Sequence, residues 1–187
     1  DLIERYQAGE LDFTQVSLRG ENLSEFCLSR INLDDSDLSE ANLSASNLKD
    51  ANLTAATLNA ATLWRTDLSR ADLVRVNFNQ AVLVRANLAF ANLCQARLMQ
   101  ADLRLVNLCG ADLSQADFTG ADLRYADLRD ANLKGADLSK ANLTGANLSG
   151  VNLSHGNRPT TARAILQASR DSKQSQLHTF APSLPPP

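Results

Sequence analysis

The sequence predicts an all-β solenoid, in which short extended segments coil around a narrow apolar core. Two columns of residues lead to this prediction. Every fifth residue from Phe13 to Leu153 is Leu or Phe, with 26 Leu and 3 Phe among 29 positions. Two residues before each of these lies a second column, from Leu11 to Val151, which holds Ala in 18 of its 29 positions. Because no position breaks the Leu/Phe period, the repeat defines one continuous unit.

A period of five residues fits neither a helix nor a flat strand. In an α-helix of about 3.6 residues per turn, side chains five apart would spiral around the surface. In extended backbone, the Leu/Phe and Ala columns point to one face and the residue between them points away. The other two residues of each pentapeptide must then bend the chain. We therefore expect one short side per pentapeptide, with the large and small apolar side chains alternating inside.

The intervening column identifies the repeat. It is Asn or Asp in 23 of 29 positions, so the consensus is Ala-(Asp/Asn)-Leu-x-x, as in Ala111–Gln115 and Ala131–Gly135. This array resembles the pentapeptide-repeat proteins and is similar to cyanobacterial members of that family. The resemblance covers residues 11 to 153. It implies a right-handed quadrilateral β-helix of about seven coils, roughly 34 Å long at a strand spacing of about 4.8 Å.

Both ends of such a rod need a cap, because they expose apolar side chains and unpaired backbone. Residues 1–10 are expected to form an N-terminal capping helix that ends near Gly9, with one apolar face made by Leu2, Ile3 and Tyr6. The β-helix is expected to span 11–154.

After Leu153 the period stops, and Asn157-Arg158-Pro159 is typical of a chain break. We expect residues 155–170 to form a second, helical cap. Residues 171–187, which end in Pro185, Pro186 and Pro187, are expected to be a flexible tail. A proline-rich docking motif in that tail is the alternative.

The composition argues against an enzyme. Only two histidines occur, His155 after the last repeat and His178 in the tail, and Cys94 and Cys109 have no histidine beside them in the sequence. The aspartates belong to the repeat, where a carboxylate or amide can bond to nearby backbone. No phosphate-binding glycine loop or Cys-x-x-Cys pair is present. We therefore predict no catalytic, cofactor-binding or metal-binding residue, and no small-molecule substrate.

The location is expected to be cytoplasmic. Three cysteines are too few for a disulfide framework, which favours a reducing compartment. No apolar run is long enough to span a membrane, and no signal peptide is visible, although a leader before Asp1 can have been removed.

Stacking residues twenty apart brings one unusual outward face together. It places Trp64 over Val84 and Leu105 over Tyr125, with Phe90 on the next side. The predicted protein-interaction face comprises Trp64, Arg65, Val84, Arg85, Phe90, Arg104, Leu105, Arg124 and Tyr125. Trp, Tyr and Arg are enriched at interface hot spots. The alternative is purely structural: arginine stems cover the aromatic rings, and Asp102 and Asp122 neutralise the charge.

The resulting functional prediction is a non-catalytic scaffold or regulatory adaptor that binds a protein partner along this outer face. Some members of the similar family resemble DNA and bind type II topoisomerases, which gives the alternative of a DNA-mimicking inhibitor or protector. A faithful mimic of about 34 Å would carry about 20 negative charges. Residues 1–154 have 14 basic against 20 acidic residues, and the repeat has no insertion, which disfavours mimicry and nucleic-acid binding. A monomer is favoured, with a dimer through an end or the side face as the alternative.

Overall fold

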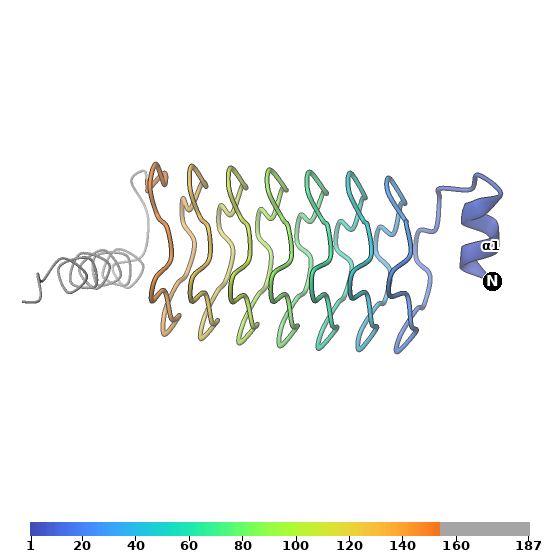
Figure 1. Cartoon of the computed structure of the whole chain (residues 1–187), viewed down its shortest axis with the longest axis horizontal. Coiled ribbons are helices and arrows are strands. Elements are labelled where there is room, and N and C mark those ends of the chain that lie inside the picture. The colour runs from blue at the N-terminus through green and yellow to red at the C-terminus, as the bar shows by residue number, and fades with distance from the viewer. Residues whose placement is uncertain (154–187) are drawn as a thin grey trace, which may run out of the picture.

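The computed structural model describes residues 1–153 of the 187-residue chain. Parallel β-bridges join residues twenty apart, from Asp12–Asn32 at one end to Asn132–Asn152 at the other. Each extended segment contributes a single bridge residue, so one coil takes twenty residues and the coils stack into a rod (Figure 1). The predicted all-β solenoid is confirmed. The expected C-terminal cap, 155–170, and the tail, 171–187, lie outside the described residues.

Backbone hydrogen bonds hold successive coils together. The Phe13 amide donates to the Asn32 carbonyl at 2.8 Å, and the Asn32 amide donates to the Leu11 carbonyl at 2.7 Å. The same pair of bonds recurs along the rod, so the backbone of each coil is paired by the coils on either side of it. This pairing is what allows sides of only five residues to be stable.

A tight turn follows every Leu or Phe. The Ala41 amide donates to the Leu38 carbonyl at 3.1 Å, which closes a four-residue turn. The third residue of that turn, Glu40, has φ of 61°. A positive φ at this position is the signature of a type II turn. The two residues that the consensus leaves open are therefore the corner residues, and their side chains face outward.

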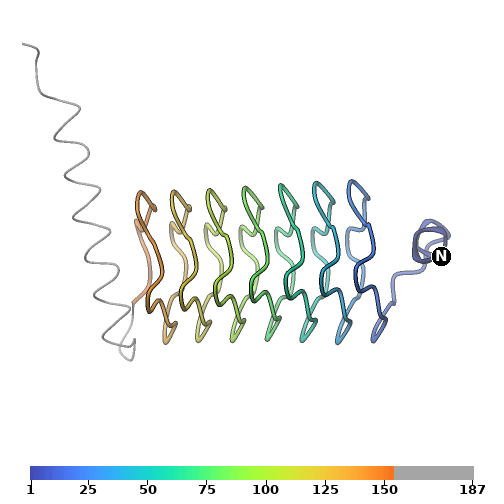
Figure 2. The ribbon, with the colours of Figure 1, turned by 90° about the horizontal axis from the view of Figure 1, so that it is seen from below.

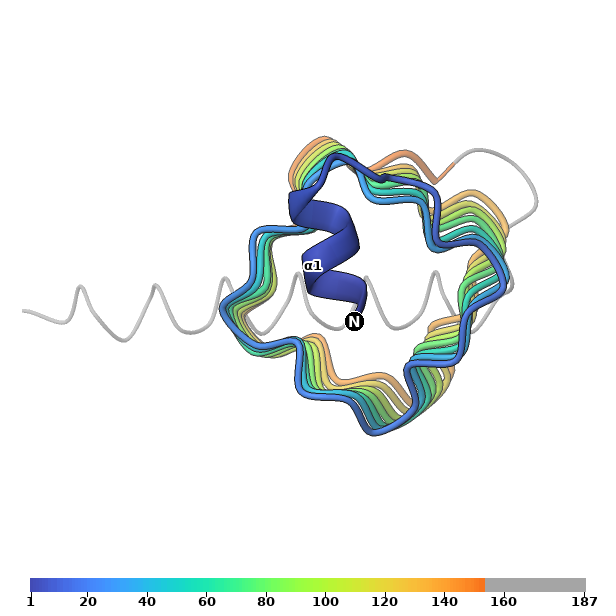
Figure 3. The same cartoon turned by 90° about the vertical axis from the view of Figure 1, so that its right-hand side faces the viewer.

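The Leu/Phe and Ala columns form the core, as predicted. The leucines of the inward column from Leu33 to Leu138 are at most 1% exposed, and the three phenylalanines of that column are at most 2% exposed. Viewed along the axis, the coils superimpose around this interior (Figure 3). Large and small side chains thus fill the coil, and the functional surface has to be on the outside.

The helix α1, Leu2–Gln7, lies at the N-terminal end of the rod (Figure 2). Asp1 is its N-cap, and the Asp1 Oδ1 accepts a hydrogen bond from the Ile3 amide at 3.0 Å. Its apolar residues Leu2, Ile3 and Tyr6 pack against the core, and the Tyr6 hydroxyl donates to the Ser29 carbonyl at 2.9 Å. Seen down the axis, α1 lies across the opening of the first coil (Figure 3).

Candidate protein-binding surface

The register places eight of the nine predicted residues on one corner of the rod. Residues twenty apart are bridged, so the corner residues after Leu63, Leu83, Leu103 and Leu123 lie above one another. We call this corner the aromatic–arginine ridge. It consists of two adjacent columns: Trp64, Val84, Arg104 and Arg124 in the first, and Arg65, Arg85, Leu105 and Tyr125 in the second. Phe90 lies at the following corner, one side away.

Large apolar side chains are exposed on this ridge. Trp64 is 41% exposed, Leu105 46% and Tyr125 62%. The Tyr125 ring lies close against the next coil, since a Cβ added at Gly145 would be 2.5 Å from Tyr125 Cδ1. Phe90 has the same relation to Gly110, where an added Cβ would be 2.5 Å from Phe90 Cε1. Phe90 and Tyr125 are thus each followed, twenty residues later, by a glycine that makes room for the ring.

Two arginines of the ridge are paired with aspartates of their own side. Arg104 forms a two-point ion pair with Asp102, with Nη2–Oδ2 at 2.7 Å and Nε–Oδ1 at 2.8 Å. Arg124 pairs in the same way with Asp122, with Nη2–Oδ2 at 2.6 Å. The hydrogen bond from the Arg124 guanidinium holds the pKa of the Asp122 carboxyl below its usual value. The charge neutralisation expected from Asp102 and Asp122 is therefore present.

The charges of the other two arginines of the ridge are not balanced by a carboxylate within the described residues. The Arg65 guanidinium carbon lies 4.4 Å from the centre of the Trp64 ring, a cation–π contact. Within residues 1–153, neither Arg65 nor Arg85 has a carboxylate partner. The ridge is thus cationic around Trp64, Arg65 and Arg85, and close to neutral around Leu105 and Tyr125.

The aspartates and asparagines of the repeat are occupied by structural hydrogen bonds. The Asn107 Oδ1 accepts from the Cys109 amide at 3.0 Å, and the Asn107 Nδ2 donates to the Asn87 Oδ1 at 3.1 Å. The first bond closes the corner and the second joins two coils. Residues 1–153 contain no cluster of three His, Cys, Asp or Glu that could hold a metal ion. No helix within this range is long and apolar enough to cross a membrane.

Comparison with solved structures gives several neighbours of the same repeat type. HetL, involved in heterocyst differentiation regulation in the cyanobacterium Nostoc sp. strain PCC 7120, is 30% identical over 83% of this chain and 97% of HetL, with a TM-score of 0.42. A thylakoid-lumen protein from Arabidopsis thaliana is 35% identical over 57% of this chain and 70% of its own, with a TM-score of 0.43. A trypsin-treated form of QnrB1, a plasmid-mediated fluoroquinolone resistance protein, is 20% identical over 88% of this chain and 85% of its own, with a TM-score of 0.53.

A search of curated proteins gives no significant match. The family model for pentapeptide repeats matches 8 copies, in the segments 27–65, 63–100, 86–124, 101–139 and 126–157. These segments cover more than half of the chain, and the five-residue period and inward leucines agree with them. The chain therefore belongs to the pentapeptide-repeat family, whose members form right-handed β-helices.

Proposed function

We propose that this protein is a non-catalytic scaffold or regulatory adaptor that binds a protein partner along the aromatic–arginine ridge. The observation that carries the proposal is the exposure of Trp64, Leu105 and Tyr125 on one corner of the rod. Aromatic residues and arginine are the types enriched at the centres of protein interfaces. The matched family model describes a repeat and no catalytic activity, which supports a role in binding.

The ridge is organised before any partner arrives. Tyr125 rests against Gly145, and Arg104 and Arg124 are each fixed by a two-point ion pair. Side chains that are already ordered lose less conformational entropy on binding. Because Arg65 and Arg85 have no carboxylate partner within the described residues, the complementary partner surface is apolar at its centre and acidic opposite these two residues.

The alternative, a DNA-mimicking inhibitor or protector of a type II topoisomerase, is also compatible with membership of the family. QnrB1, at 20% identity, supports the shared fold alone. The charge of this chain favours the adaptor, since residues 1–153 carry 14 basic against 20 acidic residues and the ridge itself is cationic. HetL and QnrB1 serve different roles in their own organisms, so the partner of this chain has to be identified directly.

The proposal also includes the architecture that presents the ridge. We propose a rod of about seven coils, from 29 pentapeptides at four per coil, with α1 as its N-terminal cap. The packing of Leu2, Ile3 and Tyr6 against the core supports the cap. A monomer stays the predicted state, and the side face offers the alternative route to a dimer.

Site-specific photocrosslinking tests the proposal. Benzoylphenylalanine is placed at position 105 on the ridge or, as the matched control, at position 115, which has the same corner geometry on a different corner (φ of 58° at both). We expect a partner protein to crosslink from position 105 and not from position 115. A second copy of the chain as the crosslinked species would assign the ridge to a dimer. Equal crosslinking from both positions would contradict the proposal.

A further inference from the structure

The intervening column of the repeat is interrupted twice in succession beside the ridge. This column lies between the Ala and Leu/Phe columns and is Asn or Asp in 23 of 29 positions. On the side that leads into the ridge, bridged residues of successive coils read Asn42, Thr62, Val82 and Asp102. The two coils that carry Trp64 and Val84 are therefore the ones in which Asn or Asp is missing.

The interruption leaves two corner amides without their usual acceptor. In this column, an Asn or Asp side chain accepts a hydrogen bond from the amide two residues later, as Asp102 does from the Arg104 amide at 3.3 Å. Valine has no side-chain acceptor, and Thr62 makes no such bond. The amides of Trp64 and Val84 have no hydrogen-bond acceptor among residues 1–153. The missing acceptor would lie outside the coil, because this column points away from the core.

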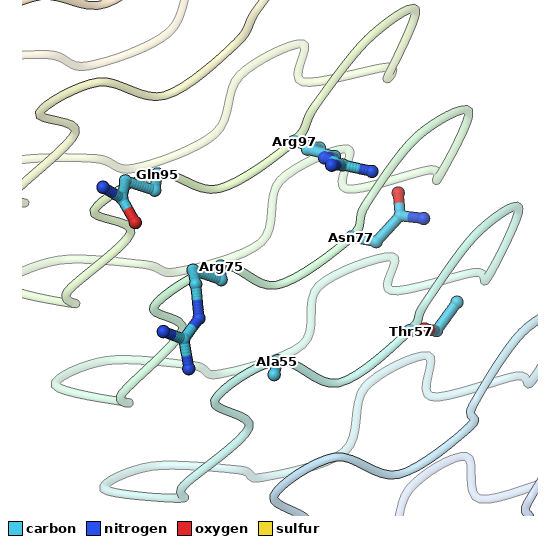
Figure 4. A pocket seen from close by; sticks show the side chains of 6 residues that line it. All are labelled: Ala55, Thr57, Arg75, Asn77, Gln95 and Arg97. Carbon is cyan, nitrogen blue, oxygen red and sulfur yellow. The ribbon is translucent and has the colours of Figure 1, made fainter.

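Elsewhere in the described part of the chain the interruption is isolated. The other positions of the column without Asn or Asp are Ser17, Cys27, Thr57 and Arg97. No two of them occupy successive coils of one side. At Arg97, which lines a surface hollow with Thr57 and Asn77 (Figure 4), the Met99 amide donates instead to the Asn79 Oδ1 at 3.0 Å. Within residues 1–153, the ridge is thus the one place where two neighbouring coils both lack the acceptor.

The same two coils hold the ridge arginines that have no carboxylate partner within the described residues. Arg65 directly follows Trp64, and Arg85 directly follows Val84. Two backbone amides and two guanidinium groups therefore lie in adjacent coils on one corner. Hydrogen bonds that involve a charged group are among the stronger ones in proteins, so an anionic acceptor fits these donors best.

Two carboxylates stand close to this corner, and both are engaged in other bonds. Asp102, bridged to Val82, holds the Arg104 guanidinium at 2.7 and 2.8 Å. Asp67, on the following side, accepts from the Ser69 amide at 2.9 Å. Neither forms an ion pair with the two unpaired guanidinium groups. They reduce the positive potential of the corner, but they do not supply the missing acceptors.

The next two coils of the ridge are apolar. Leu105 is 46% exposed and Tyr125 is 62% exposed, while the arginines beside them are neutralised by Asp102 and Asp122. The ridge thus changes along the rod from unpaired donors to apolar surface. A complementary segment needs acceptors at one end and apolar side chains at the other.

The spacing of the corners selects a helical segment. The ridge runs along the rod, and its coils repeat at roughly 4.8 Å. An α-helix brings a new turn to the same face every 5.4 Å or so, about the same spacing. Residues on one face of a strand are about 6.8 Å apart and would lose register within four coils.

We propose that the ridge binds an amphipathic α-helix of a partner protein that carries two acidic residues one turn apart. Their carboxylates accept hydrogen bonds from the Trp64 and Val84 amides, beside the two unpaired guanidinium groups. The partner thereby supplies the acceptors that are missing from the intervening column. Apolar side chains of its next two turns pack on Leu105 and Tyr125. This inference rests on the proposed function and adds the chemistry that the ridge recognises.

A carboxylate fits these corners better than a phosphate. In the next two coils of the same column, the corresponding amides of Arg104 and Arg124 donate to the carboxylates of Asp102 and Asp122, at 3.3 and 3.2 Å. The corner is therefore already shaped to receive a carboxylate oxygen. The exposed apolar residues that follow match a protein segment and not a nucleic acid backbone.

The test uses the fluorescence of Trp64, the single tryptophan of the chain, during titration of the full chain with a synthetic helical peptide. The peptide carries two glutamates one turn apart and two leucines on the same face in the following turns. We expect a saturable change, with NMR shifts at the Trp64 and Val84 amides. A matched peptide with glutamine in place of both glutamates is expected to bind about tenfold more weakly or worse.

The variant that combines Thr62→Asn and Val82→Asn gives both amides an acceptor within the chain. It restores the common residue of the column, so it folds. We expect it to weaken binding of the glutamate peptide about tenfold and to leave binding of the glutamine peptide unchanged. Thr57→Asn is the matched control, because it makes the same change in the same column one side away. It is expected to leave both affinities unchanged.

Three results would overturn the inference: no saturable change with the glutamate peptide, equal affinity for the two peptides, or equal affinity of the wild type and the asparagine variant. A single-stranded oligonucleotide that binds as tightly as the glutamate peptide would also overturn it, in favour of a phosphate. A protein that crosslinks from position 105 equally in the wild type and the asparagine variant would overturn this inference and leave the proposed function standing. Glutamate-selective peptide binding with no crosslinked protein would support the inferred chemistry and contradict the proposed function.

Discussion

Every corner of the rod places one residue in the left-handed backbone region. From Gln15 to Gly150 all of these corner residues have φ between 54° and 72°, and most are not glycine. This conformation costs about 1–2 kcal/mol for a residue with a Cβ. The turn hydrogen bond and the bonds to the adjacent coils offset this cost. Where the middle position of the pentapeptide is Asn or Asp (the Asx column), its side chain adds a bond to the corner amide, as Asn107 does for Cys109. Glycine is therefore required only where a neighbouring side chain needs the space, as at Gly110 and Gly145.

The packing of Tyr125 on Gly145 can be measured with a pair of substitutions. Gly120→Ala adds little beyond left-handed strain, because the nearest atom to its new Cβ is Gln100 Cγ at 3.6 Å. Gly145→Ala also forces Tyr125 to move. We expect Gly145→Ala to lower the free energy of unfolding by about 1 kcal/mol more than Gly120→Ala in urea denaturation. Equal losses, or a difference that persists when Tyr125 is changed to Gln, would contradict the packing.

The sides of the coil are built on the Asx column, the mostly Asn or Asp position between the Ala and Leu/Phe columns. This column serves three purposes. It closes corners, joins coils and, where an arginine lies two residues later, forms an ion pair. Asp122 and Asp127 each combine a bond to the corner amide with a guanidinium pair. The hydrogen bonds from Arg124 and Arg129 lower the pKa of these two carboxyls.

The lowered pKa of Asp122 predicts that the wild type loses stability in acid and that Asp122→Asn reduces this loss. The pKa of Asp122 is lower in the folded state than in the unfolded state, where it is about 4. Its stabilisation is therefore complete above that unfolded value and is lost as pH falls through the folded value. Asparagine keeps the acceptor for the Arg124 amide but does not titrate. We expect the urea midpoint of Asp122→Asn to fall less than that of the wild type between about pH 7 and pH 3.

Asp112→Asn is the control for this experiment. Asp112 closes its corner by accepting from the Ser114 amide at 3.0 Å, and no ion pair to it is found within the described residues. This variant should follow the pH dependence of the wild type. If Asp122→Asn also does so, the ion pair with Arg124 contributes nothing to stability.

The helix α1 is held to the rod by the Tyr6 hydrogen bond, by a cation–π contact of Arg5 with the Phe13 ring at 4.8 Å from its centre, and by apolar packing. Tyr6→Phe keeps the ring and removes the hydroxyl that donates to the Ser29 carbonyl at 2.9 Å. We expect a loss of about 0.5–1.5 kcal/mol in the free energy of unfolding. Tyr125→Phe is the control, because the Tyr125 hydroxyl has no hydrogen bond to residues 1–153 and should change stability little. A Tyr6→Phe variant as stable as the wild type would show that the hydroxyl bond does not contribute to holding α1.

At the scale of the whole molecule, the side chains inside the rod repeat regularly, whereas the outward side chains differ from corner to corner. The core could be predicted from the sequence because one Leu/Phe position and one mostly Ala position recur without a slip. The ridge could also be predicted, because stacking at twenty residues follows from that register. The pairing of Arg104 with Asp102 was an open alternative, since side-chain rotamers decide whether two residues on one side meet.

Other features could be recognised only from the structure. The glycines opposite Phe90 and Tyr125 are visible in the sequence at a spacing of twenty, but their meaning depends on how the rings lie. Arg97 was likewise visible as a break in the Asx column. The hollow beside it, lined by Ala55, Thr57, Arg75, Asn77, Gln95 and Arg97 (Figure 4), depends on the side-chain volumes in three coils, which no linear pattern specifies.

The ridge is the central claim, and comparative affinity capture from a lysate of the source organism tests it most directly. The ridge variant combines Trp64→Ser, Leu105→Gln and Tyr125→Gln, residue types that occupy the same corner positions elsewhere in the repeat. The control variant combines Gln80→Ala, Met99→Ser and Gln100→Ala on another corner. We expect quantitative mass spectrometry to find a protein retained by the wild type and the control and lost by the ridge variant, with circular dichroism unchanged. Identical protein lists for all three chains would contradict the account.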